Sequence, residues 1–186
     1  EDDLTGIAFI SSDIADIISF ILQMDSDTTG RFDDIMFFLP DAAAKDLLLT
    51  ETSGVSETIY ARISGSRPSL PSGIIFDNFA ASYEAYTGTT AQESVFSAFS
   101  YDATWIGLYG LIWAHYQEDP NSGTSIARGL RKISDKSGMG IPISLSSWTD
   151  VMINFEEGSA IDVSGASGEL DFDSTTEETT NSIEIW

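Results

Sequence analysis

One acidic segment has the residue spacing of a calcium-binding loop. In the run Asp25-Ser26-Asp27-Thr28-Thr29-Gly30-Arg31-Phe32-Asp33, side-chain oxygens recur at the first, third and fifth positions, glycine follows at the sixth and aspartate at the ninth. The candidate metal ligands are Asp25, Asp27, Thr29 and Asp33. An EF-hand loop also needs a bidentate carboxylate at its twelfth position, where this chain has Met36. We therefore expect a turn rich in side-chain hydrogen bonds rather than a metal site.

No other group of residues predicts catalysis. The chain has no cysteine and a single histidine, His115, in a segment with a helical pattern; a helix C-terminus stabilises such a side chain without any catalytic role. The nucleophile elbow Gly-x-Ser-x-Gly, the phosphate-binding Walker loop and the dinucleotide fingerprint Gly-x-Gly-x-x-Gly are all missing from the sequence. A second acidic cluster, at Asp171, Asp173, Glu177 and Glu178, is typical of a solvated turn. We expect a protein that is not an enzyme and uses no cofactor; calcium-assisted hydrolysis is the weakest alternative.

Composition and charge exclude several classes of partner. With 186 residues, 42% of them hydrophobic, the chain is long enough to bury a core. Its 30 acidic and 8 basic residues give a net charge of −22, which repels phosphate backbones and anionic lipids over a Debye length of roughly 10 Å in ~0.1 M salt. We therefore expect no nucleic acid partner. No run approaches the ~20 apolar residues of a membrane span, so direct membrane insertion is not expected, and acidic Asp2 and Asp3 predict a chain that is mature, truncated or cytoplasmic.

The N-terminal third alternates predicted strands and helices. Between Ile14 and Met24 the apolar residues recur at i, i+3, i+4 and i+7, which indicates a helix with one buried face, and Ser11-Ser12-Asp13 before it are typical N-cap residues. Strands are expected at Thr5–Ile10, Ile35–Leu39 and Ile59–Ser64, with a second helix from Ala42 to about Leu49. This alternation predicts an α/β fold with a Rossmann-like, three-layer parallel sheet.

A segment rich in proline and serine, Ser69–Gly73, separates this region from a mainly helical one. Helices are expected at Ile75–Tyr86, Ser97–His115 and Ser125–Ser134, and another from Ser147-Trp148 with Val151, Met152 and Phe155 on one face. Strands are expected at Ile141–Leu145, Ile161–Val163, Glu169–Phe172 and Ile183–Trp186. The segments Gly165–Asp173 and Ser182–Trp186 are predicted to form a C-terminal hairpin around a polar turn.

Motifs in the second half occur in an order that is typical of one known family. They are Phe79-Ala80-Ala81-Ser82-Tyr83-Glu84-Ala85-Tyr86-Thr87-Gly88, then Tyr101-Asp102-Ala103, then Gly165-Ala166-Ser167-Gly168-Glu169-Leu170-Asp171-Phe172-Asp173. In these motifs the chain resembles the C-terminal half of the type I periplasmic solute-binding proteins, the amino-acid and amide receptors of ABC transporters. The resemblance implies a partial periplasmic-binding-protein type I fold. It implies that residues 1–70 and 141–186 form an α/β segment of the second lobe with a C-terminal β-hairpin, and residues 71–140 a helical segment of the first lobe and hinge.

The resemblance also implies ligand-binding positions after two of the predicted strands. Asp41, with Ala42 beside it, stands where several family members place a carboxylate that receives a ligand ammonium. A carboxylate at the carboxyl end of a parallel strand faces the crevice where open α/β sheets bind ligands, and it pairs with a cation through charge-assisted hydrogen bonds. Ser66 and Arg67 follow the third predicted strand, and Arg67 could attract a ligand carboxylate. The alternatives are that Asp41 only caps a helix and that Ser66 and Arg67 form a surface turn.

Tyr101 heads the helix that lies near the hinge in the family, where an aromatic ring could stack on a ligand. The alternative is that Tyr101 packs in the core. Asp102, next to it, is expected to cap the same helix.

Two functions from different classes follow from these expectations. The first is non-catalytic binding of a small polar solute, such as an amino acid, by part of an extracytoplasmic or periplasmic receptor that closes by hinge motion. Its partners would be the small-molecule ligand and the membrane subunits of an ABC transporter. The second is an interaction or oligomerisation module of the same fold, for example a homodimer, without a small-molecule site. The apolar predicted helices Ile75–Tyr86 and Ser97–His115 favour it, since they would need a cover.

Overall fold

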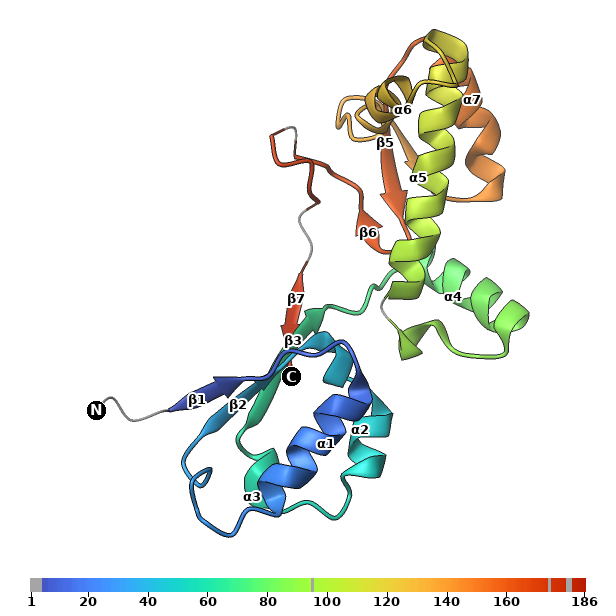
Figure 1. Ribbon diagram of the computed structural model, residues 1–186. Coiled ribbons are helices and arrows are strands. Elements are labelled where there is room, and N and C mark those ends of the chain that lie inside the picture. Colours follow the sequence, from blue (N-terminus) through green and yellow to red (C-terminus); the bar gives the residue numbers. More distant parts are fainter. Residues whose placement is uncertain (1–4, 95, 174, 180–181) are drawn as a thin grey trace. The chain divides into compact units, whose positions relative to one another are not determined.

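The chain forms two compact units in a computed structural model that describes residues 5–94, 96–173, 175–179 and 182–186 (Figure 1). Unit 1 comprises Glu1–Ser69 with Ser182–Trp186, and unit 2 comprises Leu70–Asn181. Each unit contains both helices and strands, so the chain is a mixed α/β protein. The boundary after Ser69 falls at the proline- and serine-rich segment that the sequence marks as a linker.

Unit 1 is built on a four-stranded sheet in the order β1-β2-β3-β7. Its strands are β1 (Gly6–Ala8), β2 (Met36–Leu39), β3 (Ile63–Pro68) and β7 (Ile183–Ile185), and its helices are α1 (Ile14–Asp25), the 3₁₀ helix η1 (Asp41–Ala43), α2 (Asp46–Glu51) and α3 (Glu57–Tyr60). The first three strands are parallel, as expected, whereas β7 runs antiparallel to β3. An entirely parallel sheet was therefore the wrong expectation, because the last strand reaches β3 from the far end of the chain and not through a crossover helix.

Helices cover one face of this sheet within the described residues. Phe37 and Leu39 of β2 are buried in one cluster with residues from all three helices α1, α2 and α3. Met36 and Phe38, which point to the opposite face, are 51% and 43% exposed. The predicted three-layer arrangement is thus wrong for this unit. Parallel connections are almost always right-handed, and when strands follow each other in chain order each such connection returns its helix to the same face.

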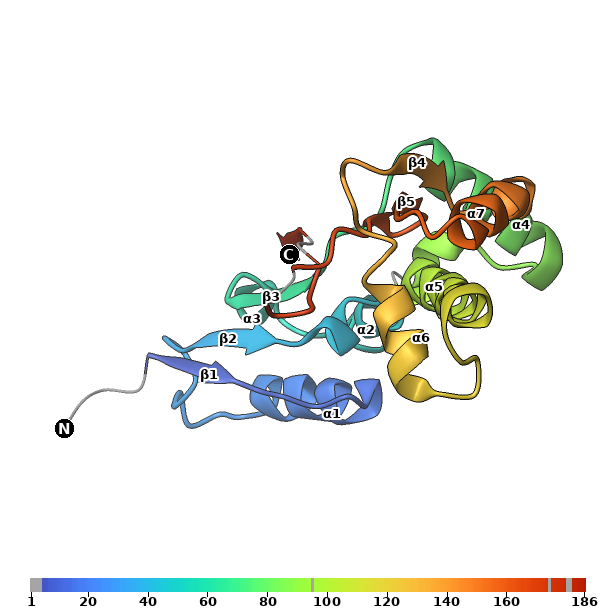
Figure 2. The same cartoon turned by 90° about the horizontal axis from the view of Figure 1, so that it is seen from above.

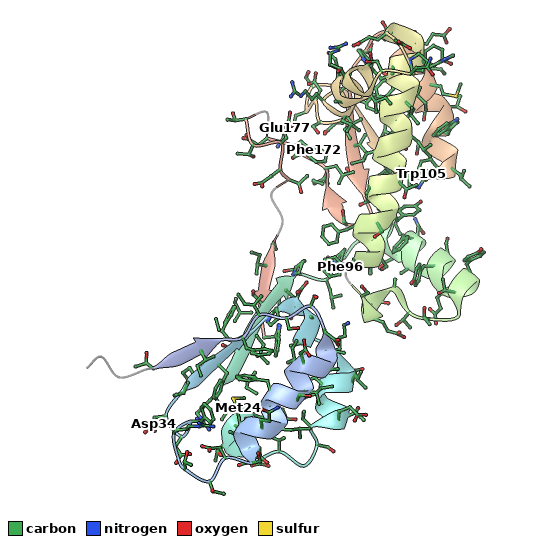
Figure 3. All side chains as sticks on the ribbon, viewed as in Figure 1. Met24, Asp34, Phe96, Trp105, Phe172 and Glu177 are labelled. Atoms are coloured by element: carbon green, nitrogen blue, oxygen red, sulfur yellow. The ribbon has the colours of Figure 1, made fainter. Side chains whose placement is uncertain are left out.

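Helix α1 forms where the sequence predicts it. The Asp13 side chain accepts a hydrogen bond from the Ala15 N–H at 2.9 Å, which satisfies one of the free amides of the first turn. Ile17 and Ile21 are fully buried against the sheet. In Figure 3, Met24 marks the last turn of this helix, and it belongs to the same core.

The two connections that follow differ from the sequence prediction. The helix expected from Ala42 is interrupted: η1 ends at Ala43, and α2 begins at Asp46. Ile59 and Tyr60, expected as the start of a strand, instead end the helix α3, because the Ser56 side chain accepts from the Thr58 N–H at 3.3 Å as an N-cap. Strand β3 therefore starts later and extends further, so that Ser66 and Arg67 lie within it and not in a loop after it.

In its described residues, unit 2 combines four helices with a three-stranded sheet in the order β4-β5-β6. Its helices are α4 (Ile74–Thr87), α5 (Phe96–Gln117), α6 (Gly123–Leu130) and α7 (Trp148–Glu156), with 3₁₀ turns η2 (Ala91–Glu93) and η3 (Leu145–Ser147), and its strands are β4 (Met139–Pro142), β5 (Ile161–Gly165) and β6 (Gly168–Glu169). Helix α5 packs against α6 and α7 (Figure 1, Figure 2). The shared core includes the buried Tyr109, Val151 and Phe155. Throughout the described part of the chain, no helix is both long and apolar enough to cross a membrane.

The division into units differs from the one expected. Residues 141–181 were grouped with the N-terminal segment, but they belong to unit 2, and only the stretch from Ser182 onwards returns to unit 1. The predicted hairpin between 165–173 and 182–186 is likewise wrong. Strand β6 pairs with β5 and β7 pairs with β3, so the two segments belong to different sheets.

Asp102 connects α5 to the β5–β6 turn and is not a helix cap. The residue is 2% exposed, and its carboxylate accepts hydrogen bonds from the Ala166 N–H at 2.9 Å, the Ser167 N–H at 2.7 Å and the Ser167 hydroxyl at 2.6 Å. Burial raises the pKa of Asp102, while the bonds from Ser167 and Ala166 lower it again in part. At Gly165 a Cβ atom would stand 2.2 Å from the Asp102 carboxylate, so this contact requires glycine.

Candidate functional site

A pocket of about 510 Å³ opens at the carboxyl ends of the parallel strands of unit 1. Its apolar walls come from Phe9, Ile10, Phe38, Pro40, Pro68 and Ile183. Its polar side chains are Asp41, Ser66 and Arg67. Open α/β sheets bind ligands at this edge, and three of the five residues implied by the family resemblance meet there.

Asp41 enters the pocket because β2 stops at the residue before Pro40. Pro40 adopts an extended conformation (φ −75°, ψ 174°) and η1 begins directly after it. The Ala42 N–H donates to Asp41 Oδ1 at 2.9 Å, which holds the carboxylate in place. Ala42 is not among the residues that line the pocket; its contribution is this bond. Within the described residues, Asp41 Oδ2 has no hydrogen-bond partner, so one oxygen is available to a ligand.

Arg67 is held by an ion pair. Its Nε donates to Glu184 Oε2 at 2.9 Å, and the two side chains are 25% and 41% exposed. The sheet register places Arg67 of β3 directly opposite Glu184 of β7. Ser66, one residue earlier in the strand, points to the opposite face of the sheet from Arg67.

The C-terminal strand is the part of the site that sequence reasoning missed. Ile183 lines the pocket and Glu184 binds Arg67 across 117 positions of sequence. The strand is fixed at Gly65, whose N–H donates to the Trp186 carbonyl at 2.8 Å and whose carbonyl accepts from the Trp186 N–H at 3.0 Å. The apolar Ile183-Glu184-Ile185 pattern signals a strand, but nothing in it identifies β3 as the partner.

Tyr101 belongs to unit 2, where it packs among aromatic side chains. The ring centroids of Tyr101 and Phe79 are 4.8 Å apart, and those of Tyr101 and Trp105 are 6.1 Å apart. Trp105 projects from α5 and is labelled in Figure 3. Burial raises the pKa of Tyr101, and a hydrogen bond with Trp105 opposes that rise. Together with Tyr83, these rings line a separate hollow of about 810 Å³ within unit 2, so Tyr101 packs in an aromatic cluster and also borders a hollow.

In the acidic segment 25–33, carboxylate oxygens accept hydrogen bonds from other residues of unit 1. Asp25 Oδ1 accepts from the Ser56 N–H at 3.0 Å. Asp27 Oδ2 accepts from the Thr29 hydroxyl at 2.7 Å and lies 3.5 Å from Arg31 Nε. The Asp33 N–H donates to the Gly30 carbonyl at 3.2 Å, which closes a turn. Across the described ranges, no group of three or more histidine, cysteine or acidic side chains has an arrangement that could hold a metal ion.

The arrangement in unit 1 suits non-covalent recognition, because its polar groups are a carboxylate, a hydroxyl and an ion-paired guanidinium among apolar walls. No family model, curated protein or solved structure matched the chain when it was compared with each of these collections.

Proposed function

We propose that the chain binds a small polar solute in the pocket of unit 1 and does no chemistry on it. The observation that carries the proposal is the meeting of Asp41, Ser66 and Arg67 at the carboxyl edge of a parallel sheet, in a pocket with otherwise apolar walls. Pockets of this kind gain affinity from apolar contact and orientation from a few placed polar groups. A pocket with apolar walls and a few polar groups suits a solute with a positively charged or hydrogen-bonding end and a short carbon skeleton, such as an amino acid or a related compound.

The proposal extends to the class of protein. A β-α-β-α-β order in unit 1, a run of helices in unit 2 and a final strand that returns to unit 1 are compatible with part of a type I solute-binding protein of an ABC transporter. Such a receptor acts in the periplasm or elsewhere outside the cytoplasm, and hinge closure would complete its site. The mixed α/β composition supports this reading only at the level of fold class.

The test is a calorimetric and thermal-shift screen of the protein against the common amino acids and their amides. Saturable stabilisation by at least one of them is expected. Asp41→Asn should then weaken an ammonium-bearing ligand by roughly tenfold or more, since a hydrogen bond to a charged group contributes about 1.5–3 kcal/mol. Asp34→Asn is the matched control: it removes the same charge from an exposed aspartate that does not line the pocket, and it is labelled in Figure 3. Equal affinities for the two variants would refute the role of Asp41.

A second candidate function is an interaction module, and the uncovered face of the unit 1 sheet favours it. Met36, Phe38, Ile183 and Ile185 are all substantially exposed there, and strand alternation places them on the same face. Exposed apolar patches often mark contact surfaces. Light scattering across a range of protein concentrations separates the candidates, because a tight dimer favours the module and a monomer that responds to solutes favours the receptor.

A further inference from the structure

The two charged side chains that line the unit 1 pocket differ in whether they already have an ion-pair partner. Asp41 contributes a carboxylate to the lining, and Arg67 contributes a guanidinium that is already paired with Glu184. Among the described residues, the ion pairs include Arg67–Glu184 but none that involves Asp41. A ligand therefore meets one negative charge without an ion-pair partner and one positive charge that is already paired with Glu184.

The Arg67–Glu184 pair is built into the sheet and is not a chance meeting of two long side chains. Glu184 stands opposite Arg67 in the register of β3 and β7. Main-chain bonds fix β7 on both sides of this position, from Ser69 N–H to the Ser182 carbonyl at 3.0 Å and between Gly65 and Trp186. Because cross-strand neighbours lie within reach of each other, this register keeps Glu184 next to Arg67.

From this charge distribution we infer that the solute is a small organic cation, a primary amine with an apolar body and without a carboxylate, and that Glu184 determines this preference. The inference rests on the proposed solute-binding function and specifies its ligand class. The ammonium binds Asp41, and the apolar body contacts the apolar lining on the Arg67 side of the sheet, which includes Phe9. The net charge of −22 on the chain adds a long-range attraction for cations.

A zwitterionic amino acid is disfavoured because its carboxylate has to compete with Glu184 for the Arg67 guanidinium. Like charges that face each other across a binding site are a common source of discrimination. Replacement of Glu184 by glutamine keeps a hydrogen-bond acceptor for Arg67 Nε and removes the competing charge. The guanidinium is then free to attract a ligand carboxylate.

The experiment compares three ligands with the same branched alkyl chain by isothermal titration calorimetry: leucine, 3-methylbutylamine, which lacks the carboxylate of leucine, and 4-methylpentanoate, which lacks its amino group. The wild-type protein should bind the amine roughly fivefold to tenfold more tightly than leucine, the range expected for one partly exposed charge interaction, and the anion least. Glu184→Gln should bring the affinities for leucine and the amine to within about twofold of each other. Arg67→Gln should move the preference in the opposite direction, towards the amine. The matched control is Glu51→Gln, which removes an exposed glutamate of α2 that does not line the pocket.

The outcomes separate the inference from the function on which it rests. If leucine binds the wild-type protein as tightly as the amine, the inference is overturned while solute binding stands. An unchanged ratio of amine to leucine affinity in Glu184→Gln overturns the role of Glu184, and a purely structural defect would lower both affinities together. If a folded wild-type protein binds none of the three ligands and none of the wider panel, the proposed function itself fails. Circular dichroism of each variant establishes that it is folded, and Arg67→Gln provides the second variant should Glu184→Gln unfold.

Discussion

Gly65→Ala should detach the C-terminal strand from unit 1. A Cβ atom at this position would lie 2.4 Å from Trp186 Cζ2 and 2.6 Å from the Leu39 carbonyl oxygen. Both distances are far below an ordinary contact. The Leu39 oxygen belongs to the neighbouring strand β2 and cannot move without a distortion of the sheet, so the Trp186 indole has to leave its place.

The magnitude follows from overpacking and from the loss of indole contacts. Extra atoms forced into a packed site cost about 1–3 kcal/mol, and the backbone obstacle at Leu39 puts this site in the upper part of that range. For a unit of this size a loss of about 2–3 kcal/mol lowers the melting temperature by roughly 10–20 °C. Because β7 carries Glu184 and Ile183, the same substitution should also weaken solute binding.

Tryptophan fluorescence provides the assay, since Trp186 is the only one of the four tryptophans that belongs to unit 1. A red shift of its emission is expected in Gly65→Ala, together with the lower melting temperature. Gly54→Ala is the matched control, because a Cβ atom at Gly54 meets nothing within 4 Å. An unshifted emission and a melting temperature within 2 °C of the wild type, where about 10 °C or more is predicted, would refute the reasoning that Gly65 and Trp186 hold the strand.

Two further predictions concern charged groups of unit 2. Asp102→Asn should destabilise the protein by about 1–3 kcal/mol in chemical denaturation, because an amide can turn only one acceptor oxygen towards the donors of Ala166 and Ser167. Since the pKa of Asp102 is raised in the folded state, its contribution to stability is present below the ordinary carboxyl pKa and is lost as the pH rises through the raised value. The loss of stability as the pH rises above the ordinary aspartate pKa of about 4 should therefore be smaller in Asp102→Asn, and an unchanged slope would contradict this assignment. Glu118 accepts from Arg128 Nε at 2.9 Å and 2.8 Å, and these bonds lower the pKa of Glu118 to about 2. The resulting stability is present above the ordinary glutamate pKa and is lost as the pH falls through about 2; in Arg128→Gln an NMR titration should return the Glu118 pKa towards its ordinary range, and a value that stays near 2 would show that Arg128 is not the cause.

Local patterns predicted most of the individual elements. The cap residue Asp13 and the i, i+3, i+4 spacing of apolar residues after it predicted α1. The helices expected at Ile75–Tyr86 and Ser97–His115 correspond to α4 and α5. These predictions succeed because helix capping and amphipathic spacing act within a few residues of chain. The prediction failed at Ile59 and Tyr60, because a short apolar segment is compatible with either a strand or a helix and the Ser56 cap selects the helix.

The candidate site was only partly accessible from the sequence. Asp41, Ser66 and Arg67 were singled out by a family resemblance and by their place after predicted strands, and in the structure they line one pocket. Ala42 does not line that pocket and contributes its amide to Asp41, and Tyr101 lies in unit 2, in an aromatic cluster that borders a different hollow. The role of Glu184 could not be predicted from the sequence, because the pairing partner of the C-terminal strand depends on contacts with distant parts of the chain.

The sequence by itself determined the acidic charge, the absence of thiol chemistry, the α/β class and the places where most helices begin, because these depend on composition and on interactions between near neighbours. Only the tertiary structure decided that the last five residues belong to unit 1 and complete its sheet. It also decided that Asp102 of α5 is buried against the β5–β6 turn and that Glu184 lies beside Arg67. Strand pairing and burial arise from the packing of the whole chain, in which residues 117 positions apart become neighbours. No local pattern contains that information.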